Sequence, residues 1–88
     1  MASLPPLRRI HADQIYNLRR YRRSIEYWQS RSTAEIVSSL RPRPADPSYQ
    51  EYLKVRADGV IFQGNTRVFV LESRGYDIES LQRYPLDR

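Results

Sequence analysis

The stretch that most constrains the fold is Leu53–Tyr76, because it holds all three glycines of the chain and most of its consecutive apolar residues. A short apolar run, Val60-Ile61-Phe62, leads into Gly64-Asn65-Thr66-Arg67. The chain continues as Val68-Phe69-Val70-Leu71 and then reaches Gly75, a residue typical of the end of an element. The residues that precede Leu53 therefore have to pack against this stretch.

Two interpretations of the residues after the apolar run stay open on the residues alone. Gly64-Asn65 can form a two-residue turn into a third strand over Thr66–Val70, which β-branched and aromatic residues favour. Alternatively, Asn65 can cap a helix that runs to about Arg74, with Gly75 in the left-handed conformation behind it. The residues support the two interpretations almost equally, with a slight preference for the hairpin.

The first half of the chain predicts two helices. From about His11 to Gln29, apolar residues recur at helical spacing and form a stripe that can face a core; its main members are Leu18, Tyr21, Ile25 and Trp28. Ser32-Thr33-Ala34-Glu35 then matches a capping box and predicts a second, shorter helix to about Leu40. A proline-rich connection over residues 41–49 ends that helix.

The second half predicts a small sheet. Tyr52–Arg56 alternates apolar and basic residues, and Asp58-Gly59 is a good hairpin signal before the apolar run. With 88 residues there is room for one domain only. We therefore expect an α+β domain in which a long N-terminal helix and a short second helix precede two or three short strands, followed by a helix that begins at the Gly-Asn-Thr-Arg motif. Residues 1–9 are predicted to form a loose arm, 11–40 to be helical, 41–49 to connect, and 50–88 to hold the sheet and the motif helix, with an irregular tail from Asp77.

The composition argues against several classes of site. The chain has no cysteine and one histidine, His11, so no disulfide, thiolate nucleophile or metal site is predicted. Near the motif, Asp58 and Glu72 are the only acid/base candidates, so no catalytic residue is predicted and an enzyme is the less favoured class. There is no apolar run of membrane-spanning length and no signal-peptide pattern, so we expect a cytoplasmic protein with no membrane partner.

The formal net charge is +5, and it is unevenly distributed. Residues 1–43 carry nine arginines against three acidic residues, whereas residues 44–88 carry six basic and seven acidic side chains. A basic half attracts polyanions, and arginine suits bidentate contact with phosphate. The sequence thus predicts nucleic-acid contacts on the first helix, with a merely solvated helix face as the alternative; the candidates are Arg19, Arg20, Arg22 and Arg23.

Taken together, Leu53-Lys54-Val55, Asp58-Gly59-Val60-Ile61, Gly64-Asn65-Thr66-Arg67 and the later Gly75 resemble the ParB/sulfiredoxin-like fold of the ParB-like nuclease superfamily. The resemblance covers about Thr33–Ile78. It implies that a strand turns into a helix at Gly-x-x-Arg, where backbone amides and the arginine bind the phosphates of a nucleotide such as CTP. Free amides at a helix start do favour an anion.

This sequence departs from the family pattern at Asn65, which stands where sulfiredoxin-type members have a cysteine and CTP-hydrolysing ParB proteins have an acidic residue. The helix-turn-helix domain of ParB proteins has no counterpart here. The resemblance therefore implies a small ParB-like binding module, non-enzymatic or weakly enzymatic, which holds a nucleotide or a nucleic-acid backbone. The expected phosphate contacts are Gly64, Asn65, Thr66 and Arg67.

Two alternatives accompany this expectation. In one, the motif is only structural, with Gly64 in a turn, Asn65 as a cap, and Arg67 exposed and paired with Glu72 or Asp58. In the other, the protein is a regulatory or protein-interaction module without a ligand, and it meets a protein partner or a second copy through the apolar stripe of the first helix. The residues of that contact would be Leu18, Tyr21, Ile25 and Trp28.

Overall fold

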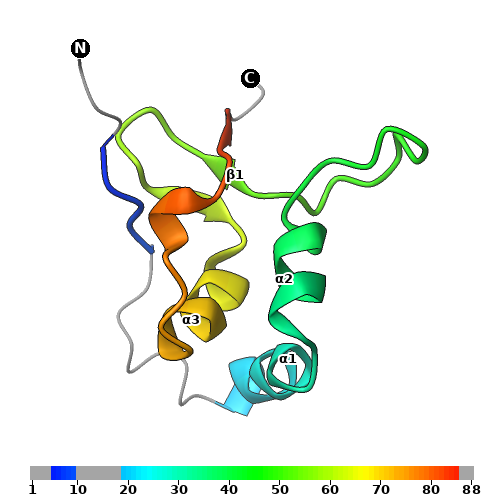
Figure 1. The fold of residues 1–88 in the computed structure, drawn as a ribbon, viewed down its shortest axis with the longest axis vertical. Helices are drawn as coiled ribbons and strands as arrows, with labels where there is room; N and C mark the ends of the chain where they lie inside the picture. Colours follow the sequence, from blue (N-terminus) through cyan, green and yellow to red (C-terminus); the bar gives the residue numbers. More distant parts are fainter. Residues whose placement is uncertain (1–4, 10–18, 86–88) are drawn as a thin grey trace.

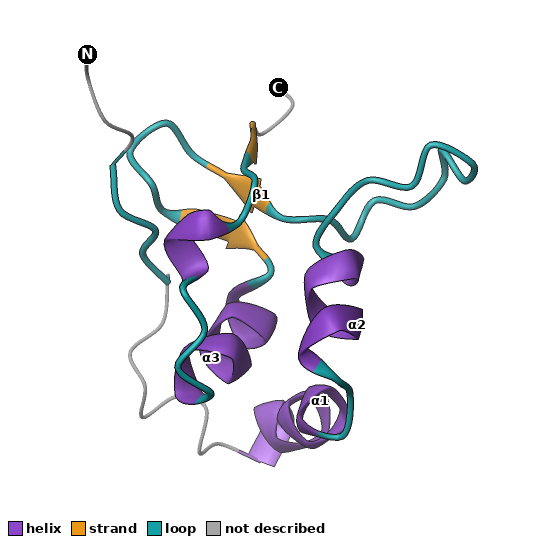
Figure 2. Ribbon diagram, in the orientation of Figure 1, coloured by secondary structure: helices purple, strands orange, loops and turns teal. Residues whose placement is uncertain are grey.

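The protein is a small α+β domain in which helices lie beside a three-stranded sheet (Figures 1 and 2). The computed structural model describes residues 5–9 and 19–85. Within these residues the elements follow the order α1 Arg19–Gln29, α2 Thr33–Ser39, β1 Lys54–Val55, β2 Ile61–Gln63, α3 Asn65–Ser73, the 3₁₀ turn η2 Ile78–Ser80 and β3 Tyr84–Pro85. None of the helices described is both long enough and apolar enough to cross a membrane.

The predicted long N-terminal helix is seen only as the 11 residues of α1. Residues 11–18, where that helix was predicted to begin, lie outside the described part of the chain. The short second helix is present as α2, and its predicted capping box is confirmed: the amide of Glu35 donates to the Ser32 hydroxyl at 3.1 Å, and the Ser32 amide donates to the Glu35 carboxylate at 3.3 Å. The connection after α2 extends away from the body of the domain (Figure 1).

The sheet has the order β2-β1-β3. Strands β1 and β2 are antiparallel and joined through the predicted turn at Gly59, while β3 lies parallel to β1. Lys54 pairs with Gln63, and Val55 pairs with Ile61, so Phe62 is an extra residue on β2. Phe62 is 59% exposed, and the chain turns into α3 directly after this irregularity.

Residues 7–9 do not form the loose arm that was predicted. Arg8 lies beside β2, where its amide donates to the Gly59 carbonyl at 2.9 Å and its carbonyl accepts from the Ile61 amide at 2.8 Å. Leu7 is buried, and its amide donates to the Glu79 carboxylate at 2.9 Å. The N-terminal segment therefore covers the outer edge of β2, because that edge would otherwise present unpaired main-chain groups.

The core lies between the helices and the inner face of the sheet. Its fully buried side chains come from α2, β1, β2, α3 and the residues next to them: Ile36, Leu40, Leu53, Ile61, Val68, Val70 and Leu71. Helix α1 joins this core through Ile25, which is buried, and through Tyr21 and Trp28, which are partly buried against it. The predicted stripe therefore packs inside the protein itself, and its remaining member, Leu18, lies outside the described residues.

Candidate functional site

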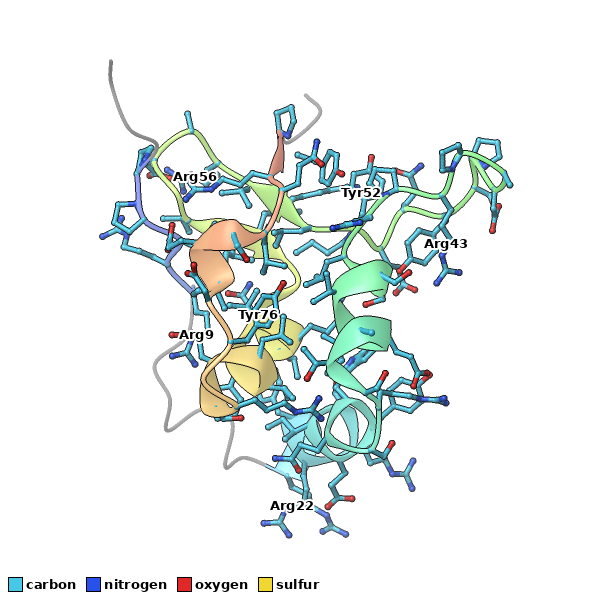
Figure 3. All side chains as sticks on the ribbon, in the orientation of Figure 1. Arg9, Arg22, Arg43, Tyr52, Arg56 and Tyr76 are labelled. Atoms are coloured by element: carbon cyan, nitrogen blue, oxygen red, sulfur yellow. The ribbon has the colours of Figure 1, made fainter. Side chains whose placement is uncertain are left out.

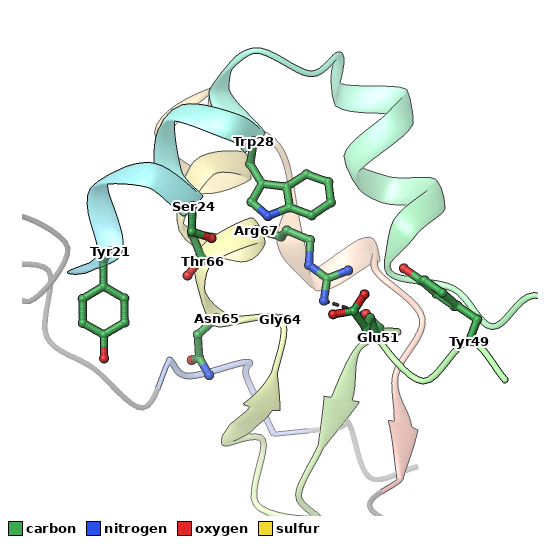
Figure 4. Close-up of a pocket in the computed structure, with 9 residues that line it drawn as sticks. All are labelled: Tyr21, Ser24, Trp28, Tyr49, Glu51, Gly64, Asn65, Thr66 and Arg67. Atoms are coloured by element: carbon green, nitrogen blue, oxygen red, sulfur yellow. Dashed lines mark hydrogen bonds between the residues drawn. The ribbon is translucent and has the colours of Figure 1, made fainter. Parts of the chain in front are cut away.

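A cavity of about 270 Å³ opens at the start of α3 (Figure 4). Three parts of the chain form its wall: one side of α1, the end of the proline-rich connection, and the first turn of α3. The cavity is lined by Tyr21, Ser24, Trp28, Tyr49, Glu51, Gly64, Asn65, Thr66 and Arg67. All four residues of the predicted phosphate motif are therefore at one site, together with five residues that were not predicted to be there.

The motif forms a helix, so the hairpin interpretation is wrong. Gly64 is the N-cap residue, with φ of 109°, a left-handed conformation that disfavours side chains. A Cβ atom at Gly64 would also lie 3.1 Å from both Leu40 Cδ2 and Leu53 Cδ1. Asn65 does not cap the helix as predicted, because it is already the first helical residue; its side-chain amide donates to the Ile61 carbonyl at 3.0 Å.

The first turn of α3 lines the cavity and carries main-chain donors that the helix itself does not use. The Val68 amide donates to the Gly64 carbonyl at 2.9 Å, which is the first bond of the helix. The amides of Thr66 and Arg67 precede that bond and have no acceptor among the described residues. Such amides and the helix dipole together favour a negative group at this position.

Arg67 forms the inner wall of the cavity and is only 7% exposed. Its Nη1 donates to the Ser39 carbonyl at 3.0 Å, its Nη2 donates to the Glu51 carbonyl at 2.6 Å, and its guanidinium lies 5.3 Å from the centre of the Trp28 ring. Burial lowers the pKa of this guanidinium, while the neighbouring Tyr49 acts in the opposite direction.

These contacts correct one expectation about Arg67 and restrict a second. As a structural residue it was expected to be exposed and paired with Glu72 or Asp58, but Arg9 pairs with Glu72 at 2.9 Å, and Arg56 pairs with Asp58 at 3.1 Å. As a ligand-binding residue it was expected to bind phosphate through the N–H groups of its guanidinium. Instead, both terminal nitrogens already donate to main-chain carbonyls, so Arg67 contributes charge to the wall more than free hydrogen bonds.

The remaining lining residues come from two elements. Tyr21, Ser24 and Trp28 share one side of α1 because they are three and four residues apart, and the sequence periodicity could have placed Ser24 beside the other two. No local sequence pattern indicated that Tyr49 and Glu51 would line the cavity. The Tyr49 hydroxyl donates to the Ser39 carbonyl at 2.6 Å, so Tyr49 and Arg67 converge on one acceptor.

The basic residues of α1 are not part of this site. Arg19, Arg22 and Arg23 are exposed and, with Glu26, surround a separate surface hollow of about 360 Å³. Only the backbone of Arg20 is described. In Figure 3, Arg22 points away from the body of the domain, on the side of α1 remote from α3. The two predicted groups of phosphate contacts are therefore separate: one is at the start of α3, and the other is on the side of α1 that faces away from it.

A scan against protein-family models found no match, and searches of the curated proteins and of the solved structures found none. Within residues 5–9 and 19–85 no three histidine, cysteine, aspartate or glutamate side chains form a group that could hold a metal ion. The geometry of the cavity, with donors at a helix start and aromatic rings nearby, suits the binding of a small anionic ligand.

Proposed function

We propose that the protein is a small ParB-like binding module that holds a phosphate-bearing ligand, a nucleotide such as CTP, in the cavity at the start of α3. The observation that carries the proposal is the pair of unbonded amides, Thr66 and Arg67, at a helix start that opens on a cavity of about 270 Å³. A phosphate group placed there accepts these hydrogen bonds and meets the positive end of the helix dipole.

The cavity wall supports a ligand with both an anionic and an apolar part. The rings of Tyr21, Trp28 and Tyr49 line the cavity, and Ser24 and Thr66 bring hydroxyl groups to it. The volume lies slightly below the range of about 300–1,000 Å³ typical of pockets for drug-sized ligands. It therefore suits a phosphate group and the adjoining sugar, with the rest of a nucleotide at the open side.

Two charges on the wall act against each other. The guanidinium of Arg67 is buried and fixed, so its attraction for an anion is weakly screened by water. The carboxylate of Glu51 lies on the same wall and repels an anion. This balance is consistent with a modest affinity that responds strongly to a change at residue 51.

The same order of elements supports kinship with the ParB/sulfiredoxin-like fold. Strand β2 ends at Gln63, Gly64 turns the chain, and α3 begins at Asn65, so a strand leads through Gly-x-x-Arg into a helix. No reaction is proposed. Glu51 is the one carboxylate among the residues that line the described cavity, and no histidine stands with it to share acid/base work.

The test is a titration of the ¹⁵N-labelled protein with CTP and, separately, with inorganic phosphate, followed by backbone amide shifts. We expect shifts centred on residues 64–68. Thr66→Glu places a carboxylate at the helix start, where it suits the dipole and stabilises α3 but repels an anion, so binding is lost while stability is kept or raised. Thr66→Gln is the neutral control and retains binding.

Glu51→Gln completes the design, because removal of the opposing charge should tighten binding of both phosphate and CTP. Unchanged amide shifts in the wild-type protein at millimolar CTP and millimolar phosphate would refute the proposal. Shifts that persist unchanged in Thr66→Glu would place the ligand elsewhere on the protein.

A further inference from the structure

The arginines of the described residues fall into two groups. Most have a partner among the described residues: Arg9, Arg31, Arg56 and Arg83 form ion pairs, Arg67 and Arg74 donate to main-chain carbonyls, and Arg43 stacks on Tyr49. The second group is exposed and forms no ion pair within the part of the chain described; its members are Arg8, Arg19, Arg22, Arg23 and Arg41. Arg19, Arg22 and Arg23 differ from the other two because they lie on α1. Three unpaired cations thus gather on one helix.

Their spacing concentrates the charge. Residues 19, 22 and 23 are three and four positions apart, so they share one face and span about 6 Å along the axis. Like charges at these spacings repel each other and destabilise an isolated helix by a few tenths of a kcal/mol per pair. Glu26 is on the same face but forms no ion pair with them among the described residues, and the four side chains surround the hollow of about 360 Å³.

This face is independent of the cavity at α3. Ser24 lines that cavity, whereas Arg22 is two residues earlier, about 200° around the helix axis. The side of α1 that carries Tyr21 and Trp28 is packed on the core, so the arginine face is turned to solvent (Figure 3). The cavity and the arginine face are therefore lined by different residues and lie on different sides of α1.

We infer that the outward face of α1, formed by Arg19, Arg22 and Arg23, binds the phosphodiester backbone of a nucleic acid. Guanidinium groups match phosphate oxygens in geometry, and the protein as a whole carries a formal charge of +5, which attracts a polyanion from a distance. The contact is with phosphates and carries no base readout, so binding is independent of nucleotide sequence. Two or three phosphates are within reach of so small a face.

The experiment measures the salt dependence of binding. A fluorescently labelled duplex DNA and a single-stranded oligonucleotide of mixed sequence are titrated with the full chain by anisotropy, from about 50 to 200 mM salt. With two or three phosphates contacted, the affinity for duplex should fall with a log–log slope of about −2 to −3. The triple variant Arg19→Gln/Arg22→Gln/Arg23→Gln should lose most of the affinity and nearly all of the slope, by about one unit for each arginine.

The matched control removes the same charge elsewhere. Arg8, Arg41 and Arg56 are exposed and lie off α1, so Arg8→Gln/Arg41→Gln/Arg56→Gln keeps the arginine face intact. This variant should retain most of the affinity and slope. Thr66→Glu, which blocks the cavity, should leave the slope unchanged, so failure of either proposal can be seen separately.

Three results would overturn the inference. One is the absence of binding to both oligonucleotides at the lowest salt concentration. A second is an equal loss in the control triple variant, because binding would then follow net charge alone. The third is binding to poly-L-glutamate as tight and as salt-dependent as to DNA, which would assign the face to acidic polymers in general. Circular dichroism of each variant verifies that the fold is kept.

Discussion

The guanidinium of Arg67 contacts Ser39, which is 28 residues earlier in the sequence. Nη1 donates to the Ser39 carbonyl at 3.0 Å and to the Ser39 hydroxyl at 3.2 Å. Through Nη2 the same side chain reaches the Glu51 carbonyl. Ser39 ends α2 and Glu51 precedes β1, so Arg67 joins the two ends of the projecting connection to α3.

This junction makes Arg67 a determinant of stability. We expect Arg67→Met to lower the free energy of unfolding by about 1–3 kcal/mol, because the Glu51 carbonyl loses its donor, whereas the Ser39 carbonyl keeps the Tyr49 hydroxyl. Arg67→Lys should lose less than Arg67→Met, since it keeps the charge, but a single ammonium cannot replace the guanidinium fork. Urea denaturation gives the values. Arg22→Met, at an exposed position, is the control, with an effect within about 0.5 kcal/mol. Equal losses at positions 67 and 22 would contradict this role.

Two glycines with left-handed backbones should differ in their tolerance of a side chain. In Gly64→Ala the new methyl group lies 3.1 Å from Leu40 and Leu53, so this variant has a steric cost in addition to the conformational cost. Gly75, at φ of 76°, has nothing within 4 Å of an added Cβ, so Gly75→Ala has the conformational cost alone. We expect Gly75→Ala to cost about 1 kcal/mol, the backbone term alone, and Gly64→Ala to cost about 1–3 kcal/mol more through overpacking. Thermal and urea unfolding of both variants test this order, and it fails if Gly75→Ala is the more damaging.

The N-terminal segment should protect the edge of β2. The Ile61 amide donates to the Arg8 carbonyl, and Leu7 anchors the segment in the core. Leu7→Ala should destabilise the domain by about 2–3 kcal/mol. Hydrogen exchange should show the Ile61 amide losing protection ahead of the amides of α3. Arg8→Ala, which keeps the main-chain bonds, is the control and should leave exchange at Ile61 unchanged.

The capping box of α2 should make stability depend on pH. The Ser32 amide is the main cause that lowers the pKa of Glu35 from 4.5, with further help from the Ser32 hydroxyl and Arg31. A carboxyl with a depressed folded pKa stabilises the fold above its unfolded pKa, and this contribution disappears as the pH falls through the folded pKa. Glu35→Gln should therefore reduce the difference in stability between neutral and acidic pH. Urea unfolding of the wild-type protein and of Glu35→Gln across that pH range measures this difference.

Local patterns predicted the parts of the fold that depend on local physics. The capping box at Ser32 fixed the start of α2, and Gly75 does end α3: its amide donates to the Glu72 carbonyl, and the next amide, from Tyr76, donates to Leu71. Both features need only residues within one or two turns. The helix at the motif was one of two open interpretations, because β-branched residues favour a strand until burial against α1 and α2 decides otherwise.

The rest could not be predicted because it depends on distant partners. Nothing within Leu7–Arg9 signals that it pairs with residues near Ile61, more than 50 positions later in the chain. The same holds for the cavity. The sequence marked Arg67 as the last residue of the Gly-Asn-Thr-Arg motif, but its burial follows from carbonyl groups at Ser39 and Glu51, which any residue type would supply.

The bond between the Leu7 amide and the Glu79 carboxylate, 72 positions apart, also sets the order of events when the chain is made. The segment at Leu7 is synthesised before its acceptor at Glu79 and before β3, the parallel strand beside β1. The Leu7 amide therefore has no Glu79 carboxylate to pair with until 72 further residues have been added, and contacts of such long separation are formed slowly. The same segment can pair with the edge of β2 at Gly59 and Ile61 before it gains this last bond.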